Sequence, residues 1–435
     1  MGINEKPTPL EIIPSFPSTP TTPKKLKEEG KALILAQQQR LDSLRKFEKV
    51  EIASNTEGRI KEVILQRDGS WFDEAFISFM QSHPKVSITM VVPSNDNKED
   101  FVKKMENANI PISRCRFIVM GENDTDISVW ARDSYVMVKA PDGKNAVMEP
   151  RGRTRYPGLS DRNVADRIVA TTGERLITSP LVFDGGDLRV SGENLFVGAI
   201  TIIQNIPKGK LATPDNVQQV VEKFQKQFGK KVIVVGFTQE IDAQGNAGGY
   251  LAPLQTTAEK AEPVFHLDLY FTPLNNNTIA IGDPALTKKV LKSMGKSIFS
   301  KREAELSGKG TLAEGLKIME ALKRFKGSKG SLPNQRQLDQ VASDMKAKGF
   351  NVIRVPYFQD GDYPMSYNNV LVENFKDGNE QVTQVSLPQY GIPELDKIAI
   401  KVYQKAGIKV IPIDGLLPGI YQMGALDCLT SEKRE

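Results

Sequence analysis

The sequence predicts a mixed α/β fold for most of its 435 residues. Short runs rich in β-branched residues alternate with segments whose apolar residues recur at helical spacing. Runs of the first kind at 63–66, 86–93 and 116–120 are separated by helical stretches at 71–82 and 98–107. This alternation is typical of repeated α/β units, so we expect sheets covered by helices.

The composition excludes several classes of protein. The chain has 58 basic and 53 acidic residues, a net charge of +5 that is too balanced to indicate a nucleic-acid binder. Its two cysteines, Cys115 and Cys428, cannot form a disulfide framework or a four-ligand zinc site, and no metal or cofactor is expected. No apolar run has the length of a signal peptide or approaches the roughly 20 residues that span a membrane. We therefore expect a cytoplasmic protein with no membrane partner.

The chain divides into three predicted regions. Residues 1–23 are rich in Pro and Thr and are expected to form a disordered tail. Residues 24–59 are expected to form a helix and a linker, and residues 60–435 the main α/β domain. Within that domain, a mostly helical insertion at about 295–349 contains no cluster of reactive side chains, and a Gly-containing loop is expected at 239–262. Loops of this length often close over a ligand.

The remaining elements continue the alternation. Further predicted strands are 134–139, 194–203, 231–236, 278–282, 352–355, 370–373, 382–386 and 409–413. Further predicted helices are 160–171, 213–228, 286–294 and 392–406. A hairpin turn is expected at 191–193.

The segment Val264–Gly282 is the centre of the predicted site. The chain has two histidines, His83 and His266. Because His83 lies in a turn-like Ser-His-Pro, His266 is the candidate for proton transfer near neutral pH, where a histidine has an unperturbed pKa of about 6.5. In HLDLYF a strand period would place His266, Asp268 and Tyr270 on one face. A buried histidine with a structural carboxylate would give the same pattern.

Three other segments carry reactive residues. VWARDSYV at 129–136 contains Trp130, Arg132 and Asp133, although a lone aspartate is often a cap or an ion-pair partner. FDGGDLRVSGENLFVG at 183–198 has two acids, Asp184 and Asp187, around a glycine pair that permits close backbone approach. MGALDCLT at 423–430 places Cys428 in a Gly-containing loop, although a lone cysteine is usually an inert small hydrophobe.

The order WARD, FDGGD, HLD and a late GxxxC resembles the guanidine-modifying, or pentein, superfamily. Its members include arginine deiminases, agmatine deiminases, dimethylargininases and protein-arginine deiminases. The resemblance covers about 60–435. FDGGDLRVSGENLFVG is similar to arginine deiminases and dimethylargininases, whereas PMSYNNVLV at 364–372 and LPQYG at 387–391 look more like protein-arginine deiminases. The resemblance implies a five-bladed α/β propeller, the pentein fold.

The resemblance also implies a cysteine hydrolase. A guanidinium is a planar cation that carboxylates bind in bidentate geometry, and a thiolate can attack its carbon. The implied catalytic residues are Cys428 (nucleophile), His266 (general acid and base), Asp133 and Asp268 (guanidinium ligands) and Asp184 (orienting the histidine). The implied substrate-binding residues are Asp133, Asp268, Asp187, Trp130 and Arg132. Asp184 stands where arginine deiminases have a glutamate one methylene longer, which leaves its contact with His266 to be tested.

The expected reaction is hydrolysis of peptidyl-arginine to peptidyl-citrulline and ammonia through a covalent thiouronium. Agmatine or free arginine is the alternative substrate, and an amidinotransferase or a non-catalytic guanidinium-binding relative remains open. The expected partner is accordingly an arginine-containing peptide or protein or a small guanidine. A homo-oligomer is also left open.

Overall fold

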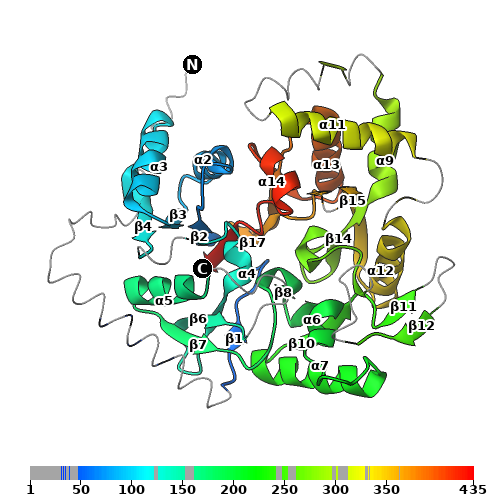
Figure 1. The fold of residues 1–435 in the computed structure, drawn as a ribbon, viewed down its shortest axis with the longest axis horizontal. Coiled ribbons are helices and arrows are strands. Elements are labelled where there is room, and N and C mark those ends of the chain that lie inside the picture. The colour runs from blue at the N-terminus through cyan, green and yellow to red at the C-terminus, as the bar shows by residue number, and fades with distance from the viewer. Residues whose placement is uncertain are drawn as a thin grey trace.

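The structure is a computed structural model that describes residues 48–121, 126–151, 161–241, 247–252, 261–295, 300–301, 312–328, 332, 334–361 and 363–435, together with residues 31, 33, 35 and 39. These residues form six β-sheets with helices between the strands (Figure 1). The mixed α/β fold predicted from the sequence is therefore confirmed. The tail predicted at 1–23 lies outside the described residues.

Five of the six sheets repeat one unit. In this unit an antiparallel pair of strands is followed by helical chain and then by a third strand that pairs in parallel with the second. A parallel neighbour needs a crossover connection, and a helical crossover also covers one face of its sheet. In Figure 1 the five sheets lie around the short helix α4 (Ala131–Ser134).

Four units follow one another along the chain. The first contains β5 (Val136–Lys139), β6 (Asn145–Glu149), α5 (Asp161–Thr172) and β7 (Arg175–Thr178), with β1 (Glu51–Ile52) at its edge. The second contains β8 (Leu188–Ser191), β9 (Asn194–Gly198), α6 (Ala199–Gln204), α7 (Pro214–Phe228) and β10 (Lys231–Val235). The third contains β13 (Phe271–Pro273), β14 (Thr278–Asp283), α9 (Pro284–Ser293), α11 (Leu312–Gly327), α12 (Gln335–Ala347), β15 (Asn351–Asp360) and β16 (Tyr363–Ser366). The fourth contains β17 (Leu371–Asp377), β18 (Glu380–Pro388), α13 (Pro393–Lys405) and β19 (Lys409–Ile413).

The fifth unit joins strands from the two ends of the domain. Strand β20 (Thr430–Arg434) pairs antiparallel with β2 (Ile60–Gln66), and Leu65 lies opposite Thr430. The parallel strands β3 (Ser87–Val92) and β4 (Cys115–Val119) follow, connected by α2 (Asp73–Ser82), α3 (Asn95–Asn107) and the 3₁₀ turn η1 (Ile112–Arg114). A separate ribbon consists of β11 (Gln239–Ile241) and β12 (Ala247–Tyr250). Because β20 begins two residues after Cys428, this pairing determines where the last sequence motif lies.

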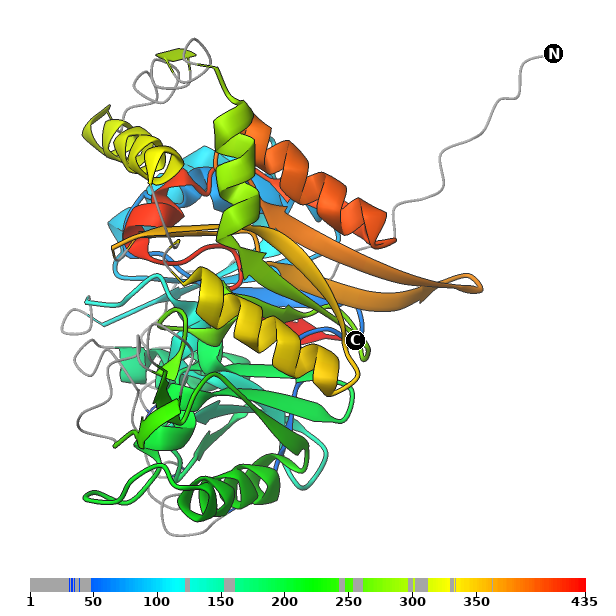
Figure 2. The same cartoon turned by 90° about the vertical axis from the view of Figure 1, so that its right-hand side faces the viewer.

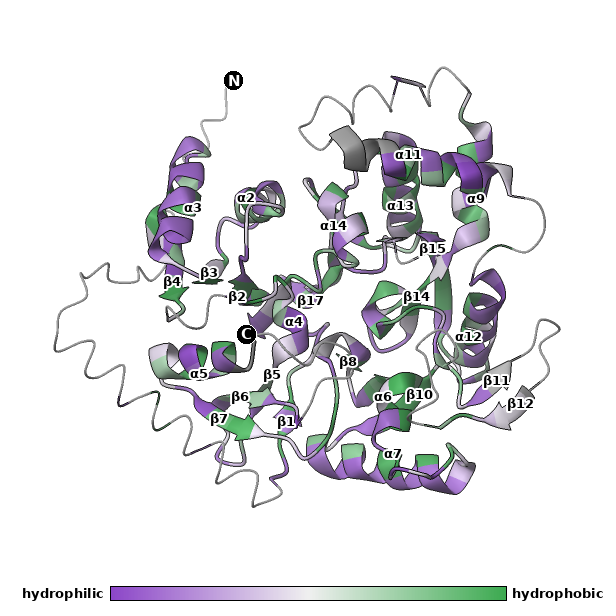
Figure 3. Cartoon of the chain, in the orientation of Figure 1, coloured by the Kyte–Doolittle hydropathy of each residue, from purple (hydrophilic) through white to green (hydrophobic). Residues whose placement is uncertain are grey.

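Helix α7 shows how local sequence sets an element. The Thr213 side chain accepts the Asn216 N–H, and Pro214 occupies the first turn, where its missing N–H costs nothing. Gly229 ends the helix with a left-handed φ of 65°. Phe224 belongs to an apolar stripe that is buried against the sheet. Figure 3 accordingly shows both hydrophilic and hydrophobic residues along α7, whereas β10 beside it is mainly hydrophobic.

Helices of the third and fourth units lie against their strands. Figure 2 shows α9, α12 and α13 across the strands of these units, and α12 contacts β14 and β15. Leu338 and Met345 of α12 are buried in one core with Ile281 and Tyr357. The described part of the 295–349 segment is mostly helical, and α12 belongs to the core. No helix among the described residues combines the length and apolar character that a membrane span requires.

Three sequence predictions differ from the structure. The strand predicted for HLDLYF is the 3₁₀ turn η3 (Leu267–Leu269) followed by β13, because the Asp187 carboxylate accepts the Leu267 N–H and holds this turn. The strand predicted at 194–203 ends at Gly198, where α6 begins and Glu262 accepts the Ile200 N–H. The loop predicted at 239–262 contains the β11–β12 ribbon.

We predict that Phe224→Ala lowers the free energy of unfolding by about 3–5 kcal/mol, because it leaves a cavity in a closely packed core. The matched control is Lys223→Ala, since the neighbouring Lys223 is exposed. Denaturant unfolding of the two variants measures the difference. An equal loss from both substitutions would contradict the burial of this face of α7.

Candidate active site

Cys428 lies in a tight loop between α14 (Leu417–Gln422) and β20. The helix ends at Met423, whose φ of 63° is left-handed, and the chain then turns through Gly424. A Cβ atom on Gly424 would lie 2.5 Å from the ring of Trp130, so glycine allows the indole to cover the turn. Cys428 is only 2% exposed. The loop therefore presents a buried thiol.

Asn369, between β16 and β17, holds this loop. Its Oδ1 accepts the main-chain N–H groups of Ala425 (3.1 Å), Asp427 (2.9 Å) and Cys428 (3.1 Å). Its Nδ2 donates to the Cys428 Sγ at 3.1 Å. The sequence motifs predicted no role for Asn369. The available signal was an Asn-Asn pair, Asn368 and Asn369, within the segment that resembles protein-arginine deiminases.

His266 lies between two carboxylates. Its Nε2 donates to Asp184 Oδ2 at 3.3 Å, and its Nδ1 is 3.8 Å from Asp133 Oδ2. The contact predicted between Asp184 and His266 is thus made despite the shorter side chain. All three groups are at most 3% exposed. The structure therefore brings together three of the residues predicted from separate motifs.

The glycine pair of FDGGD lies at the centre of the site. A Cβ on Gly185 would be 1.9 Å from the main-chain oxygen of Arg132. A Cβ on Gly186 would be 3.1 Å from both Asp133 Oδ1 and Asp268 Oδ2. The Gly186 N–H also donates to Asp133 Oδ1 at 3.2 Å. Close backbone approach is the physical reason for both glycines.

Asp268 lies beside the cysteine. The Cys428 thiol donates to Asp268 Oδ2 at 3.3 Å, whereas Asp268 Oδ1 is buried with no hydrogen-bond partner among the described residues. Burial, together with the nearby negative charge of Asp427, raises the pKa of Asp268 well above its usual value. An unpartnered buried carboxylate oxygen is costly unless a ligand binds there. We therefore identify Asp268 as a candidate cation ligand.

Nearby carboxylates raise the pKa of both the cysteine and the histidine. Burial raises the pKa of the Cys428 thiol, and the charges of Asp268 and Asp133 raise it further. Burial alone lowers the pKa of His266, but the carboxylates, Asp133 first, outweigh burial and raise it to about 10. These shifts favour a neutral thiol beside a protonated imidazole at neutral pH. The pKa of His266 therefore lies well above the unperturbed value of about 6.5.

Two residues predicted to face the site lie elsewhere. The Arg132 guanidinium pairs with Asp427 at 3.0 Å and with Glu432, so it is an ion-pair partner rather than the predicted substrate ligand. The Tyr270 hydroxyl donates to Glu262 Oε2 at 3.4 Å. The strand period fails for Tyr270 because the chain makes a 3₁₀ turn there.

Asp187 supports the histidine segment. Its Oδ1 accepts the Leu267 N–H at 3.1 Å, and its Oδ2 accepts the Thr201 hydroxyl at 2.8 Å. Ligand atoms of Asp184, Asp187 and His266 all lie within 4.8 Å of one another, which is compatible in spacing with a metal ion. Because both Asp187 oxygens already accept hydrogen bonds, we assign no metal to this cluster.

A buried cluster of ion pairs adjoins the reacting residues along the chain. Arg132 and Arg189 both pair with Asp427, and Glu432 pairs with Arg132 and Arg434. The side chains of Arg189 and Asp427 are each 1% exposed, so removing one partner would leave a buried charge uncompensated. The cluster therefore links the residues that flank Asp133 and Cys428 in the chain.

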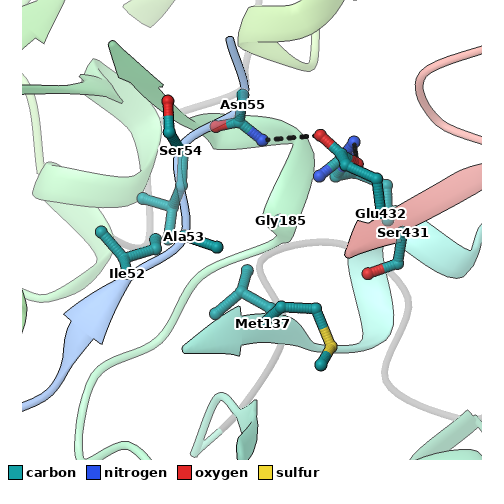
Figure 4. Close-up of a pocket in the computed structure, with 11 residues that line it drawn as sticks. Ile52, Ala53, Ser54, Asn55, Met137, Gly185, Ser431 and Glu432 are labelled. Carbon is teal, nitrogen blue, oxygen red and sulfur yellow. Dashed lines mark hydrogen bonds and ion pairs between the residues drawn. The ribbon is translucent and has the colours of Figure 1, made fainter. Parts of the chain in front are cut away.

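A pocket borders this cluster on the side formed by β1, β5 and β20. Figure 4 shows the side chains around it, with the Asn55 amide donating to Glu432 at 3.5 Å. Its lining consists of Ile52, Ala53, Ser54, Asn55, Arg132, Val136, Met137, Gly185, Leu188, Ser431 and Glu432. Neither Cys428 nor His266 lines it, so this pocket is separate from the thiol.

No protein-family model matches the chain, and a search of curated proteins finds no relative. Solved structures do match. Agmatine deiminase from Campylobacter jejuni is 14% identical, with 89% of this chain and 96% of that chain covered and a TM-score of 0.53. Agmatine deiminase from Enterococcus faecalis gives the same values. A provisional arginine deiminase from Porphyromonas gingivalis is 17% identical over 89% of this chain and 99% of that chain, with a TM-score of 0.53.

These structures share one fold with the chain over most of their length. At such low identity the similarity establishes the fold, and the resemblance drawn from the sequence motifs is confirmed at that level. The chain therefore has the mixed α/β fold of agmatine and arginine deiminases.

The pKa values of the two histidines should be shifted in opposite directions. The pKa of His266 is raised to about 10, whereas burial lowers the pKa of His83 below its ordinary value of 6.5. NMR titration of the imidazole resonances measures both, and His83→Gln assigns them. The charge of His266 stabilises the fold fully below about pH 6.5, and this contribution is lost as the pH rises towards 10. Titration of His266 near 6.5 would contradict this electrostatic description.

Proposed function

We propose that this protein hydrolyses a guanidino group, releasing ammonia and a ureido product. The observation that carries the proposal is the buried Cys428 thiol beside the partly unpartnered Asp268 carboxylate, with Asp133 and the protonated His266 next to it. Buried negative charge of this kind suits a planar cation. A thiol beside the carboxylates that bind this cation can act as the nucleophile in covalent catalysis.

Recognition in this proposal depends on Asp133 and Asp268. A Cβ on Gly186 would meet oxygens of both, so the two carboxylates border the same small volume. The nitrogen atoms of a guanidinium can donate to two carboxylates in its own plane. The bound cation also offsets the charges of Asp268 and Asp133 that raise the pKa of Cys428. Substrate binding would therefore favour release of the thiol proton.

The proposed reaction has two halves. The Cys428 thiolate attacks the guanidinium carbon and forms a tetrahedral adduct. His266 then transfers a proton to the leaving nitrogen, ammonia departs, and a thiouronium remains on the sulfur. In the second half, neutral His266 takes a proton from water, which attacks the thiouronium carbon. Collapse of this adduct breaks the C–S bond and releases the thiolate and the ureido product, and the remaining hydroxyl proton passes to the solvent.

A small guanidine such as agmatine is the substrate class we favour. The expectation of a peptidyl-arginine substrate has no support beyond the sequence resemblance, whereas two of the similar structures are named agmatine deiminases. Cys428, His266 and Asp268 are each at most 2% exposed. A small cation that enters entirely suits such burial better than an arginine on a large protein.

We also propose that the five repeated sheet units form a closed five-bladed α/β propeller. The repetition of one strand pattern supports this arrangement. The pairing of β20 with β2 supports it too, because it joins the last unit to the first strand of the domain.

Cys428→Ala should reduce turnover of agmatine by roughly 10³-fold or more, since no nucleophile remains. The matched control is Cys115→Ala, because Cys115 is buried in the core around β3 and β4 and should not affect the reaction. A colorimetric assay of the ureido product measures both variants. Full turnover by folded Cys428→Ala would overturn the proposed function.

The substrate class is tested by comparing agmatine with a blocked arginine peptide. We expect kcat/KM to be at least a hundredfold higher for agmatine, which equals about 2.7 kcal/mol of transition-state binding. The measurement is initial rate per active site under identical conditions. A higher kcat/KM for the peptide would restore the protein-modifying alternative and leave the roles of Cys428 and His266 intact.

A further inference from the structure

Asn369 makes its contacts in a fixed orientation. Three main-chain N–H groups point at one end of its side chain, from Ala425, Asp427 and Cys428. Only the amide oxygen can accept them, so the NH₂ end must face the sulfur. There Nδ2 is 3.1 Å from the Cys428 Sγ and 3.5 Å from the main-chain oxygen of Asp268. Asn369 itself is fully buried.

Negative charges surround the sulfur, so a hydrogen-bond donor there would stabilise a thiolate. Asp268 Oδ2 lies 3.3 Å from Sγ, and Asp133 and Asp427 add negative charge nearby. A sulfur anion formed there would be repelled by these carboxylates. A hydrogen bond donated to a charged group is worth more than one donated to a neutral group.

We propose that Asn369 is a catalytic residue that donates a hydrogen bond to the Cys428 thiolate and, through its oxygen, shapes the loop that presents the sulfur. This inference rests on the proposed function, in which Cys428 is the nucleophile. The same amide thus performs two tasks. Its oxygen determines where Sγ lies, and its nitrogen stabilises the charge that Sγ acquires.

The neighbouring Asn368 provides a matched control. It is also fully buried, but its Nδ2 donates to the main-chain oxygen of Ala280 and its main-chain oxygen accepts the Thr272 hydroxyl. These contacts connect β13 and β14 to the chain before β17, without touching Sγ. Asn368→Ala should therefore destabilise the fold and leave the thiol unchanged.

The test uses Asn369→Ala, Asn369→Asp and Asn368→Ala in the full chain. Asn369→Asp keeps one oxygen for the three N–H groups but places a second oxygen against the sulfur, so the ionised variant repels a thiolate. The first readout needs no substrate: ultraviolet absorbance of the thiolate against pH, taken as the difference from the corresponding Cys428→Ala protein. The second readout is kcat on agmatine, with thermal unfolding as the check on folding.

We expect both Asn369 variants to move thiolate formation to higher pH by at least about one unit and to lower kcat at least tenfold, equal to about 1.4 kcal/mol. Asn368→Ala should leave the thiolate titration in place even where its unfolding temperature falls. An unshifted titration and unchanged kcat in folded Asn369→Ala would overturn the inference, as would an equal shift in Asn368→Ala. If the wild type turned over no guanidine while the titration shifts held, the proposed function would fail and the role of Asn369 at the thiol would stand.

Discussion

The sharing of Asp427 between Arg132 and Arg189 is the interaction on which the site depends. It joins three motifs through their non-reacting members: the arginine of WARD, the arginine of FDGGDLR and the aspartate before the cysteine. Removing one partner of such a buried pair typically costs about 3–5 kcal/mol, because the remaining charge is uncompensated. The cluster therefore constrains Asp133, which follows Arg132 in the chain, and Cys428, which follows Asp427.

A second constraint is the crowding of negative charge in front of that cluster. Asp133, Asp184 and Asp268 are all buried around His266 and the thiol. Apolar surroundings alone would lower the pKa of His266, but the carboxylates reverse the direction and keep the imidazole charged. The same charges oppose a thiolate, so the proposed nucleophile needs a bound cation or an N–H donor at the sulfur to offset them.

The reactive residue types could be read from the sequence because they lie in short contiguous motifs. Cys428, His266, Asp133, Asp184 and Asp268 do lie together as predicted. Most strands and helices were also predicted within a few residues, because hydrophobic periodicity reports a buried face directly. The strand predicted for HLDLYF was wrong, because the contact that determines its conformation comes from Asp187, about 80 positions earlier.

The sequence by itself determined the alternation of helices and strands, the single histidine suited to chemistry, and the glycines that allow close backbone approach. Only the tertiary structure decided which polar residues support the site and which face it. Arg132, a predicted substrate ligand, is an ion-pair partner, and the contact of Asn369 with Cys428 joins residues 59 positions apart in the chain. The physical reason is that hydrogen bonds and charge pairs act over a few ångströms, and distances of that size between remote segments exist only after folding.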